Sequence, residues 1–94
     1  MRISWSPLAV EDVRGISDWL EQDATPATAL RIVGATRHRA RFLEDFPRGG
    51  RPHSDGQRIL RVFDTPYLIR YRIKNDTVEV IRVHHDREDW QLEP

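Results

Sequence analysis

Three short segments rich in β-branched and aromatic residues follow one another late in the chain, and they constrain the fold more than any other feature. Such composition is typical of β-strands, and the segments are 58–63, 67–73 and 78–83. Asp64-Thr65-Pro66 separates the first two, and Asn75-Asp76 precedes the third. Both breaks suit tight turns. This part of the chain is therefore predicted to be an antiparallel meander that the upstream residues must cover.

The middle strand has two different faces. The aromatic and aliphatic residues of one face recur at a period of two, which suits a core: Tyr67, Ile69, Tyr71 and Ile73. The opposite face carries Arg70 and Arg72, which fit either a solvated outer face or a basic platform for a phosphate backbone or an acidic partner. In the last strand both faces carry apolar residues, so alternation does not tell which one is inside.

Two helix starts precede the meander. Ser6-Pro7 and Thr25-Pro26 each combine an N-cap hydroxyl with proline at the first helical position. Apolar residues then recur every three or four positions, which predicts two amphipathic helices that pack on each other or on the sheet. The stripes are Ala9, Val13, Ile16 and Leu20 in the first helix, and Ala29, Val33, Thr36, Ala40 and Leu43 in the second. Trp5 and Trp19 are expected to pack in the core.

The resulting element order is β-α-α-β-β-β, with a brief first strand at Ile3-Ser4-Trp5. Helices and strands grouped in this order predict an α+β fold in which a helical hairpin packs on one face of a small, mainly antiparallel sheet. At 94 residues the chain is expected to form a single domain, 1–94. The segment 47–57 is rich in Gly and Pro and is predicted to be the one flexible loop.

The composition indicates the cellular compartment, and the charges are unevenly distributed along the chain. The chain has no cysteine and no run long enough to span a membrane, so we expect a cytoplasmic protein without a membrane partner. Its net charge is zero, yet residues 31–72 hold ten arginines and four acids, while 1–30 and 73–94 each hold more acids than bases. The sheet face left open by the helices, lined by arginine and with His84 and His85 at one rim, is where function is expected.

Several short motifs, in order along almost the whole chain, resemble the RelE/ParE toxins of bacterial type II toxin–antitoxin systems. They are Trp5-Ser6-Pro7-Leu8-Ala9 with Asp12, Ile16 and Trp19, then Gly50-Arg51, Arg58-Ile59-Leu60, Thr65-Pro66-Tyr67, Tyr71-Arg72-Ile73, and the ending from Val80 to Trp90. The resemblance implies a growth-inhibiting toxin that needs no cofactor. It also implies a cognate antitoxin protein that neutralises the toxin in a hetero-oligomer.

RelE-like members of this family cleave messenger RNA on the ribosome without a metal ion. Such cleavage needs a base for the 2′-hydroxyl, an acid for the leaving oxygen and cations for the phosphorane charge. By position, the resemblance assigns these roles to Arg58, Arg61, Arg82 and either His84 or His85. Adjacent strand residues point to opposite faces, so at most one of the two histidines is expected to serve.

ParE-like members instead poison DNA gyrase, and their ending carries His, then Arg two residues on, then Asp two further. His85, Arg87 and Asp89 match that spacing, which favours the ParE side. Target contacts would then come from the basic strand face and this ending: Arg70, Arg72, His85, Arg87, Asp89 and Trp90.

Two other functional classes stay open at this point. A degenerate toxin would act only as a module that binds an antitoxin. A metal-dependent hydrolase would use His84, His85 and Asp86, but consecutive strand residues cannot all face one ion. No metal site is therefore predicted.

Overall fold

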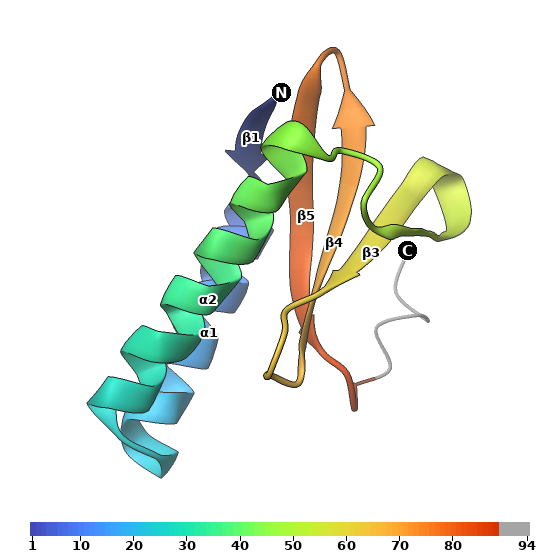
Figure 1. Ribbon diagram of the computed structural model, residues 1–94. Coiled ribbons are helices and arrows are strands. Elements are labelled where there is room, and N and C mark those ends of the chain that lie inside the picture. Colours follow the sequence, from blue (N-terminus) through green and yellow to red (C-terminus); the bar gives the residue numbers. More distant parts are fainter. Residues whose placement is uncertain (89–94) are drawn as a thin grey trace.

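The computed structural model describes residues 1–88, which form two helices on one side of a five-stranded sheet (Figure 1). The elements are β1 (Arg2–Trp5), α1 (Pro7–Asp23), α2 (Pro26–Asp45), β2 (Arg51–Pro52), a 3₁₀ turn (Ser54–Gly56), β3 (Gln57–Arg61), β4 (Tyr67–Lys74) and β5 (Thr77–His85). The strand order is β1-β5-β4-β3-β2, parallel between β1 and β5 and antiparallel elsewhere. The predicted α+β class and helical hairpin are confirmed.

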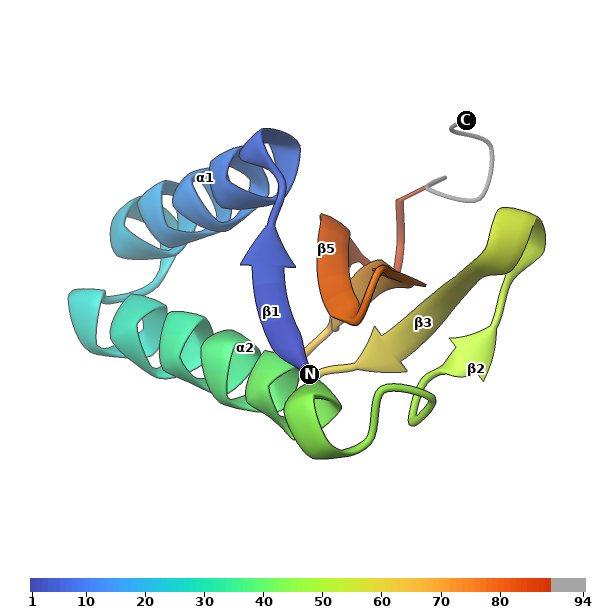
Figure 2. The same ribbon diagram turned by 90° about the horizontal axis from the view of Figure 1, so that it is seen from above.

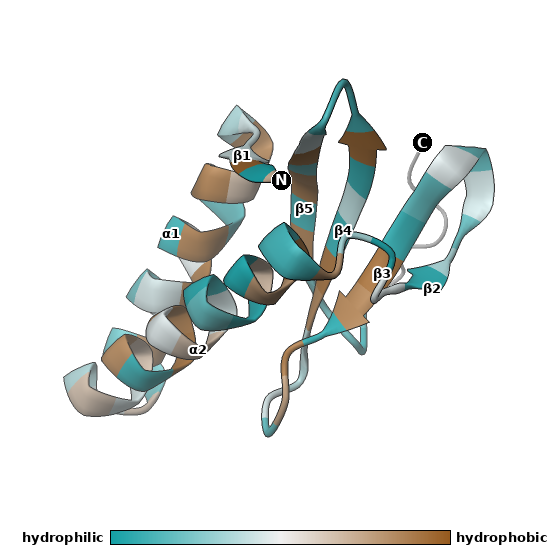
Figure 3. Ribbon diagram, turned by 45° about the horizontal axis from the view of Figure 1, so that its top comes forward, coloured by the Kyte–Doolittle hydropathy of each residue, from teal (hydrophilic) through white to brown (hydrophobic). Residues whose placement is uncertain are grey.

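Both helices begin where the cap signals predict. The hydroxyl of Ser6 accepts the N–H of Ala9 at 3.0 Å, and the hydroxyl of Thr25 accepts the N–H of Thr28 at 3.0 Å. These bonds satisfy donors that the first helical turn leaves without a backbone partner. The helices then run side by side against the same face of the sheet (Figure 2). Along both of them hydrophobic and hydrophilic bands alternate, as expected of amphipathic helices (Figure 3).

The core lies between this hairpin and the sheet, and most of the predicted stripe residues belong to it. Those that are buried are Ala9, Leu20, Ala29, Thr36, Ala40 and Leu43, while Val13, Ile16 and Val33 are half-buried. Trp5 packs against the core as predicted. The prediction for Trp19 is wrong, because its side chain is 57% exposed. Leu20, the next residue, occupies the core position, and a step of one residue turns the side chain about 100° around the helix.

A β-bulge decides which side of β5 faces the core. Tyr71 pairs with Val80 and Arg70 pairs with Arg82, so Ile81 is an extra residue between them. The bulge reverses the alternation, and both Val80 and Val83 are buried in the core. Strict alternation along the strand would place Val80 on the same face as Arg82 and His84, and the bulge makes that grouping wrong.

The segment predicted to be a flexible loop is held to the sheet at its start. The hydroxyl of Tyr71 donates to the carbonyl of Pro47 at 2.8 Å and accepts the N–H of Gly50 at 2.9 Å. Arg58 donates to the carbonyl of Gly50 at 2.8 Å. A Cβ at Gly50 would lie 2.8 Å from both the Tyr71 hydroxyl and the carbonyl oxygen of Ile59. Only glycine therefore allows this approach, and Arg51 and Pro52 then pair with β3.

Candidate functional site

The sheet face turned away from the helices, here called the second face, carries most of the predicted basic residues. Strand register places Arg61, Leu68 and His84 in one row across β3, β4 and β5, and Ile59, Arg70 and Arg82 in the next. Arg72 and Glu79 follow in a third row. Arg58 is opposite Tyr71 and therefore belongs to the helix side.

Arg70 was predicted to lie either on a solvated outer face or on a basic platform for a partner, and neither interpretation holds. Its side chain lies on a central strand between Ile59 and Arg82, and it is only 4% exposed. It is thus neither solvated nor available to a large partner. Arg72 is exposed, and its Nε donates to Glu79 at 2.6 Å. A carboxylate of the same sheet therefore offsets the charge of Arg72.

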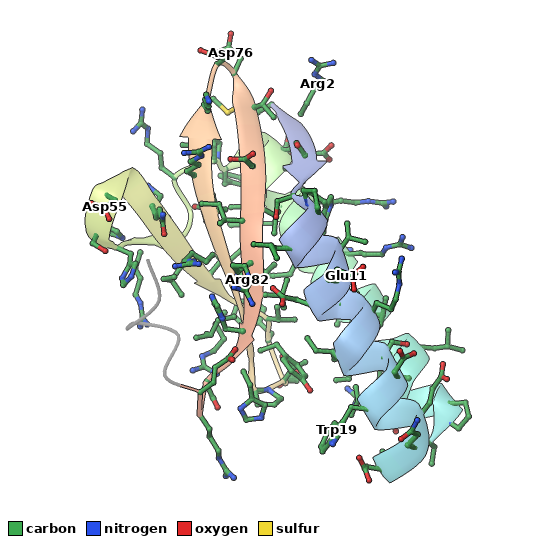
Figure 4. The ribbon with its side chains drawn as sticks, turned by 180° about the vertical axis from the view of Figure 1, so that it is seen from behind. Arg2, Glu11, Trp19, Asp55, Asp76 and Arg82 are labelled. Atoms are coloured by element: carbon green, nitrogen blue, oxygen red, sulfur yellow. The ribbon has the colours of Figure 1, made fainter. Side chains whose placement is uncertain are left out.

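Arg82 is tied to the first helix. Its Nε donates to Oδ2 of Asp12 at 2.8 Å and its Nη2 donates to Oδ1 at 3.0 Å, while the N–H of Val83 donates to the same carboxylate at 2.9 Å. The Arg82 and Asp12 side chains are 22% and 16% exposed, so this two-pronged pair is largely shielded from water. Figure 4 shows Arg82 where β5 faces α1.

Ser6 also forms hydrogen bonds with the same edge of β5. Its N–H donates to the carbonyl of Val80 at 3.0 Å, and its hydroxyl donates to the carbonyl of Ile81 at 2.7 Å. Because β1 ends at Trp5, these bonds and the Asp12 contacts continue the pairing of the strand edge. Asp12 and Arg82 are thus part of the scaffold that fixes α1 against β5.

The other two candidate arginines have different partners. Arg58 donates to the carbonyls of Arg48 and Gly50. Arg61 lies on the second face and forms an exposed ion pair with Asp86 at 3.4 Å. The candidate cations therefore do not surround one common point.

The two histidines lie on opposite sides of the strand end, as predicted. His84 is 1% exposed on the second face, and its Nδ1 is 3.0 Å from Oε1 of Glu88. Burial lowers the pKa of His84, and the neighbouring carboxylate of Glu88 offsets only part of that effect. The ring is therefore neutral at pH 7.

His85 lies on the helix side, with its ring edge-on against Tyr67 at a centroid distance of 5.5 Å. Its Nδ1 accepts the N–H of Arg87 at 3.1 Å, so in the neutral ring the proton is on Nε2. Glu88 also accepts the N–H of His85 at 2.8 Å. The side chain of Arg87 is exposed, and Asp89 and Trp90 lie outside the described residues.

A cleft of about 450 Å³ opens between α1 and the end of β5; we call it the α1–β5 cleft. It is lined by Glu11, Asp12, Gly15, Ile16 and Trp19 of α1, by Tyr67 of β4, and by Val83, His85 and Glu88. Trp19 extends from α1 on the side where β5 ends (Figure 4). Among the predicted site residues within 1–88, only His85 lines this cleft. Sequence reasoning missed Glu11, Trp19 and Glu88, although an aromatic residue at the edge of an apolar stripe was a visible signal.

Two other kinds of feature are absent from residues 1–88. In that range no three His, Asp or Glu side chains are grouped closely enough to hold a metal ion. No helix in the same range has the length and hydropathy needed to cross a membrane.

Comparison with known proteins agrees with this fold. A family model described as the ParE toxin of the type II toxin–antitoxin system parDE matches residues 3–90. "Putative toxin Y4kP" of Sinorhizobium fredii is 34% identical over 90 residues, 95% of this chain and 92% of that toxin. "Toxin RelE2" of Caulobacter vibrioides is 30% identical over 84 residues, 89% of this chain and 93% of that toxin.

A solved structure described as "Chromosomal ParDE TA system from P. aeruginosa" has a similar chain. The TM-score is 0.83 at 24% identity, over 90% of this chain and 95% of that one, which supports the fold. The family model and the sequence relatives cover nearly all of the chain. This chain therefore belongs to the ParE toxin family, in the RelE/ParE superfamily of type II toxin–antitoxin toxins.

Proposed function

We propose that this toxin inhibits DNA gyrase in the cytoplasm and that a cognate antitoxin protein neutralises it in a hetero-oligomer. One observation carries the choice of gyrase over messenger RNA. The five candidate residues for RNA cleavage lie on both sides of the sheet, and the cations among them are bonded to groups of the same chain.

Cleavage of RNA needs an acid, a base and cations within hydrogen-bond reach of one phosphate. His84 and His85 cannot reach the same phosphate, because they lie on opposite sides of β5. Turning Arg82 toward a phosphate would leave the carboxylate of Asp12 without its partner, at a cost of about 3 kcal/mol. This arrangement supports a toxin that acts by contact with a protein.

The ending of the chain supplies the surface for that contact. His85 lines the α1–β5 cleft, and Arg87 beside it is exposed. Asp89 and Trp90, which complete the predicted target contacts, follow directly in the sequence. The family model, whose description names the ParE toxin of parDE, favours the same target.

The proposed antitoxin binds through an extended segment that contains a helix. Two features support such a partner. Several large apolar side chains are exposed in the described residues, including Leu30 at 76% and Phe63 at 64%, and an extended partner would cover them. The excess of arginine in residues 31–72 favours an acidic partner.

Induction of the toxin in cells tests the choice of target. We expect filamentation, an SOS response and rescue by a mutation in gyrase, all reversed by co-expression of the antitoxin. Rapid loss of messenger RNA with cuts at ribosome-bound codons would contradict the proposal. If the cells grow normally although the toxin still binds the antitoxin, the protein is a degenerate toxin that acts only as an antitoxin-binding module.

A further inference from the structure

Carboxylates from two distant parts of the sequence, α1 and the residues just after β5, meet at the α1–β5 cleft. Residues 1–30 and 73–94 each carry more acids than bases, and α1 packs along β5. Three carboxylates line the cleft, from Glu11, Asp12 and Glu88, and the described residues that line it include no Arg or Lys. A chain with zero net charge therefore has an acidic hollow beside its histidine-bearing strand end.

The charges of these three carboxylates are offset to different degrees. Asp12 is neutralised by the two-pronged bond from Arg82. Glu88 accepts bonds from the His85 N–H and the His84 ring, and that ring is neutral because burial lowers its pKa. Glu11 pairs with Arg14, but both side chains are about two-thirds exposed and such pairs are weak. Glu11 and Glu88 thus leave negative charge on two sides of the cleft.

The walls between these acids are aromatic and aliphatic. Trp19 is more than half exposed, although it sits next to the core residue Leu20. Tyr67, Ile16 and Val83 line the cleft with it. An indole is the aromatic ring that attracts a cation most strongly, and apolar walls suit the methylene stem of a long basic side chain.

We propose that the α1–β5 cleft binds an arginine side chain of a protein partner, and that this partner is the toxin's target. A planar guanidinium can stack on Trp19 and direct two N–H donors toward Glu88, which a lysine cannot do. An acidic antitoxin would be repelled from this hollow. Arginine recognition follows from the geometry alone, whereas the assignment of the partner as gyrase rests on the proposed function.

Two matched peptides test the recognition directly. Acetyl-Gly-Arg-Gly-amide and the same peptide with citrulline differ by one charge and have nearly the same shape. In a titration followed by NMR, we expect the Trp19 indole N–H signal to shift to saturation with the arginine peptide and several-fold less with citrulline. Equal responses to both peptides, or no saturable shift with the arginine peptide, would overturn the proposal.

Two variants and two controls then link the cleft to toxicity. Trp19→Leu removes the ring, Glu88→Gln removes the charge and keeps an acceptor for the His85 N–H, and each should weaken arginine-peptide binding about 2- to 30-fold. The indole signal that disappears in Trp19→Leu is the signal of Trp19. Because this variant lacks that signal, its binding of the peptide is followed by the backbone N–H signals of α1. Gln22→Ala and Glu21→Gln remove an exposed amide and an exposed charge of α1 outside the cleft, and both should leave peptide binding, toxicity and antitoxin affinity unchanged.

The same four variants separate the two proposals. Toxicity should fall in Trp19→Leu and Glu88→Gln while antitoxin affinity persists. Loss of antitoxin affinity instead would overturn the assignment of the cleft to the target. If the arginine peptide binds and gyrase is unaffected by the toxin, the proposed function fails and the arginine site stands. If gyrase is inhibited equally by all four variants, the role of the cleft fails and the proposed function stands.

Discussion

Arg82 and His84 look alike in the sequence, as polar residues at the end of a strand, but the structure gives them separate tasks. Arg82 joins β5 to α1 through Asp12, 70 positions earlier in the chain. His84 is enclosed on the second face beside Glu88. His85, one residue on, borders the α1–β5 cleft, for which we propose an arginine side chain of the target as the ligand. Adjacent residues on opposite sides of one strand therefore differ in role, one enclosed in the fold and the other proposed to contact the partner.

His85→Gln tests whether this residue acts by contact or by proton transfer. Glutamine keeps an acceptor for the Arg87 N–H and removes the imidazole ring that could transfer a proton. We expect growth inhibition to change by less than about 5-fold, since hydrogen bonding is preserved. A loss of about 100-fold or more, together with cleavage of RNA on ribosomes by the parent protein, would indicate general acid–base catalysis instead.

The buried ring of His84 predicts that stability depends on pH. Burial holds its folded pKa below the unfolded value of 6.5, so the unfolded state binds the proton more tightly. Its contribution to stability is full above pH 6.5 and is lost as the pH falls through the folded pKa.

Urea unfolding between pH 7.5 and 5 measures this effect. His84→Gln should flatten the dependence by up to about 1.4 kcal/mol per pH unit. His38→Gln, at an exposed position of α2, is the control and should leave the slope unchanged. Identical slopes for the parent protein and His84→Gln would show that this ring does not control the pH dependence.

At the scale of elements, local chemistry predicted the helices and strands well. Ser6-Pro7 and Thr25-Pro26 mark helix starts because capping depends on a few adjacent residues. The bulge at Ile81 was not predictable, since both faces of that strand are apolar and only the register with β4 decides between them. The burial of Arg70 and the Asp12–Arg82 pair were missed for a similar reason, because they depend on residues far away in the sequence. Trp19 was misplaced because a single step around a helix separates the core from the cleft.

Gly50→Ala tests the connection between α2 and the sheet. A Cβ at this position would lie 2.8 Å from the Tyr71 hydroxyl, so the turn must shift and its hydrogen bonds weaken. We expect a loss of about 2 kcal/mol in the free energy of unfolding.

Gly34→Ala is the matched control for that substitution. Nothing lies within 4 Å of a Cβ at Gly34, and alanine in a helix is more stable than glycine by about 1 kcal/mol. The two alanine variants should therefore change stability in opposite directions when their urea midpoints are compared. A neutral Gly50→Ala would mean that the turn tolerates a side chain.

At the scale of the whole molecule, the fold gathers acidic and basic side chains into separate regions. Glu11 and Asp12 of α1 and Glu88 after β5 lie together at the α1–β5 cleft, whereas the arginines of residues 31–72 belong to α2, the loop after it and strands β2 to β4. A small toxin with two oppositely charged regions can present one region to its antitoxin and the other to its target. This separation explains how two partners of different charge would recognise one chain of 94 residues.

The association rate of the antitoxin should consequently depend on salt. Attraction between an acidic partner and the arginine-rich region speeds encounter at low ionic strength and is screened as salt is added. Stopped-flow measurements from 50 to 500 mM NaCl should show a fall of about 10-fold or more in the association rate, with a smaller change in dissociation. A constant association rate would rule out charge steering.

The most direct test of the account is the DNA that purified gyrase leaves cleaved when purified toxin, ATP and plasmid are present. We predict that linear plasmid accumulates in proportion to toxin, that antitoxin abolishes it, and that Trp19→Leu lowers it while Gln22→Ala does not. Intact plasmid at toxin concentrations that arrest growth, together with cut messenger RNA on ribosomes, would contradict the account.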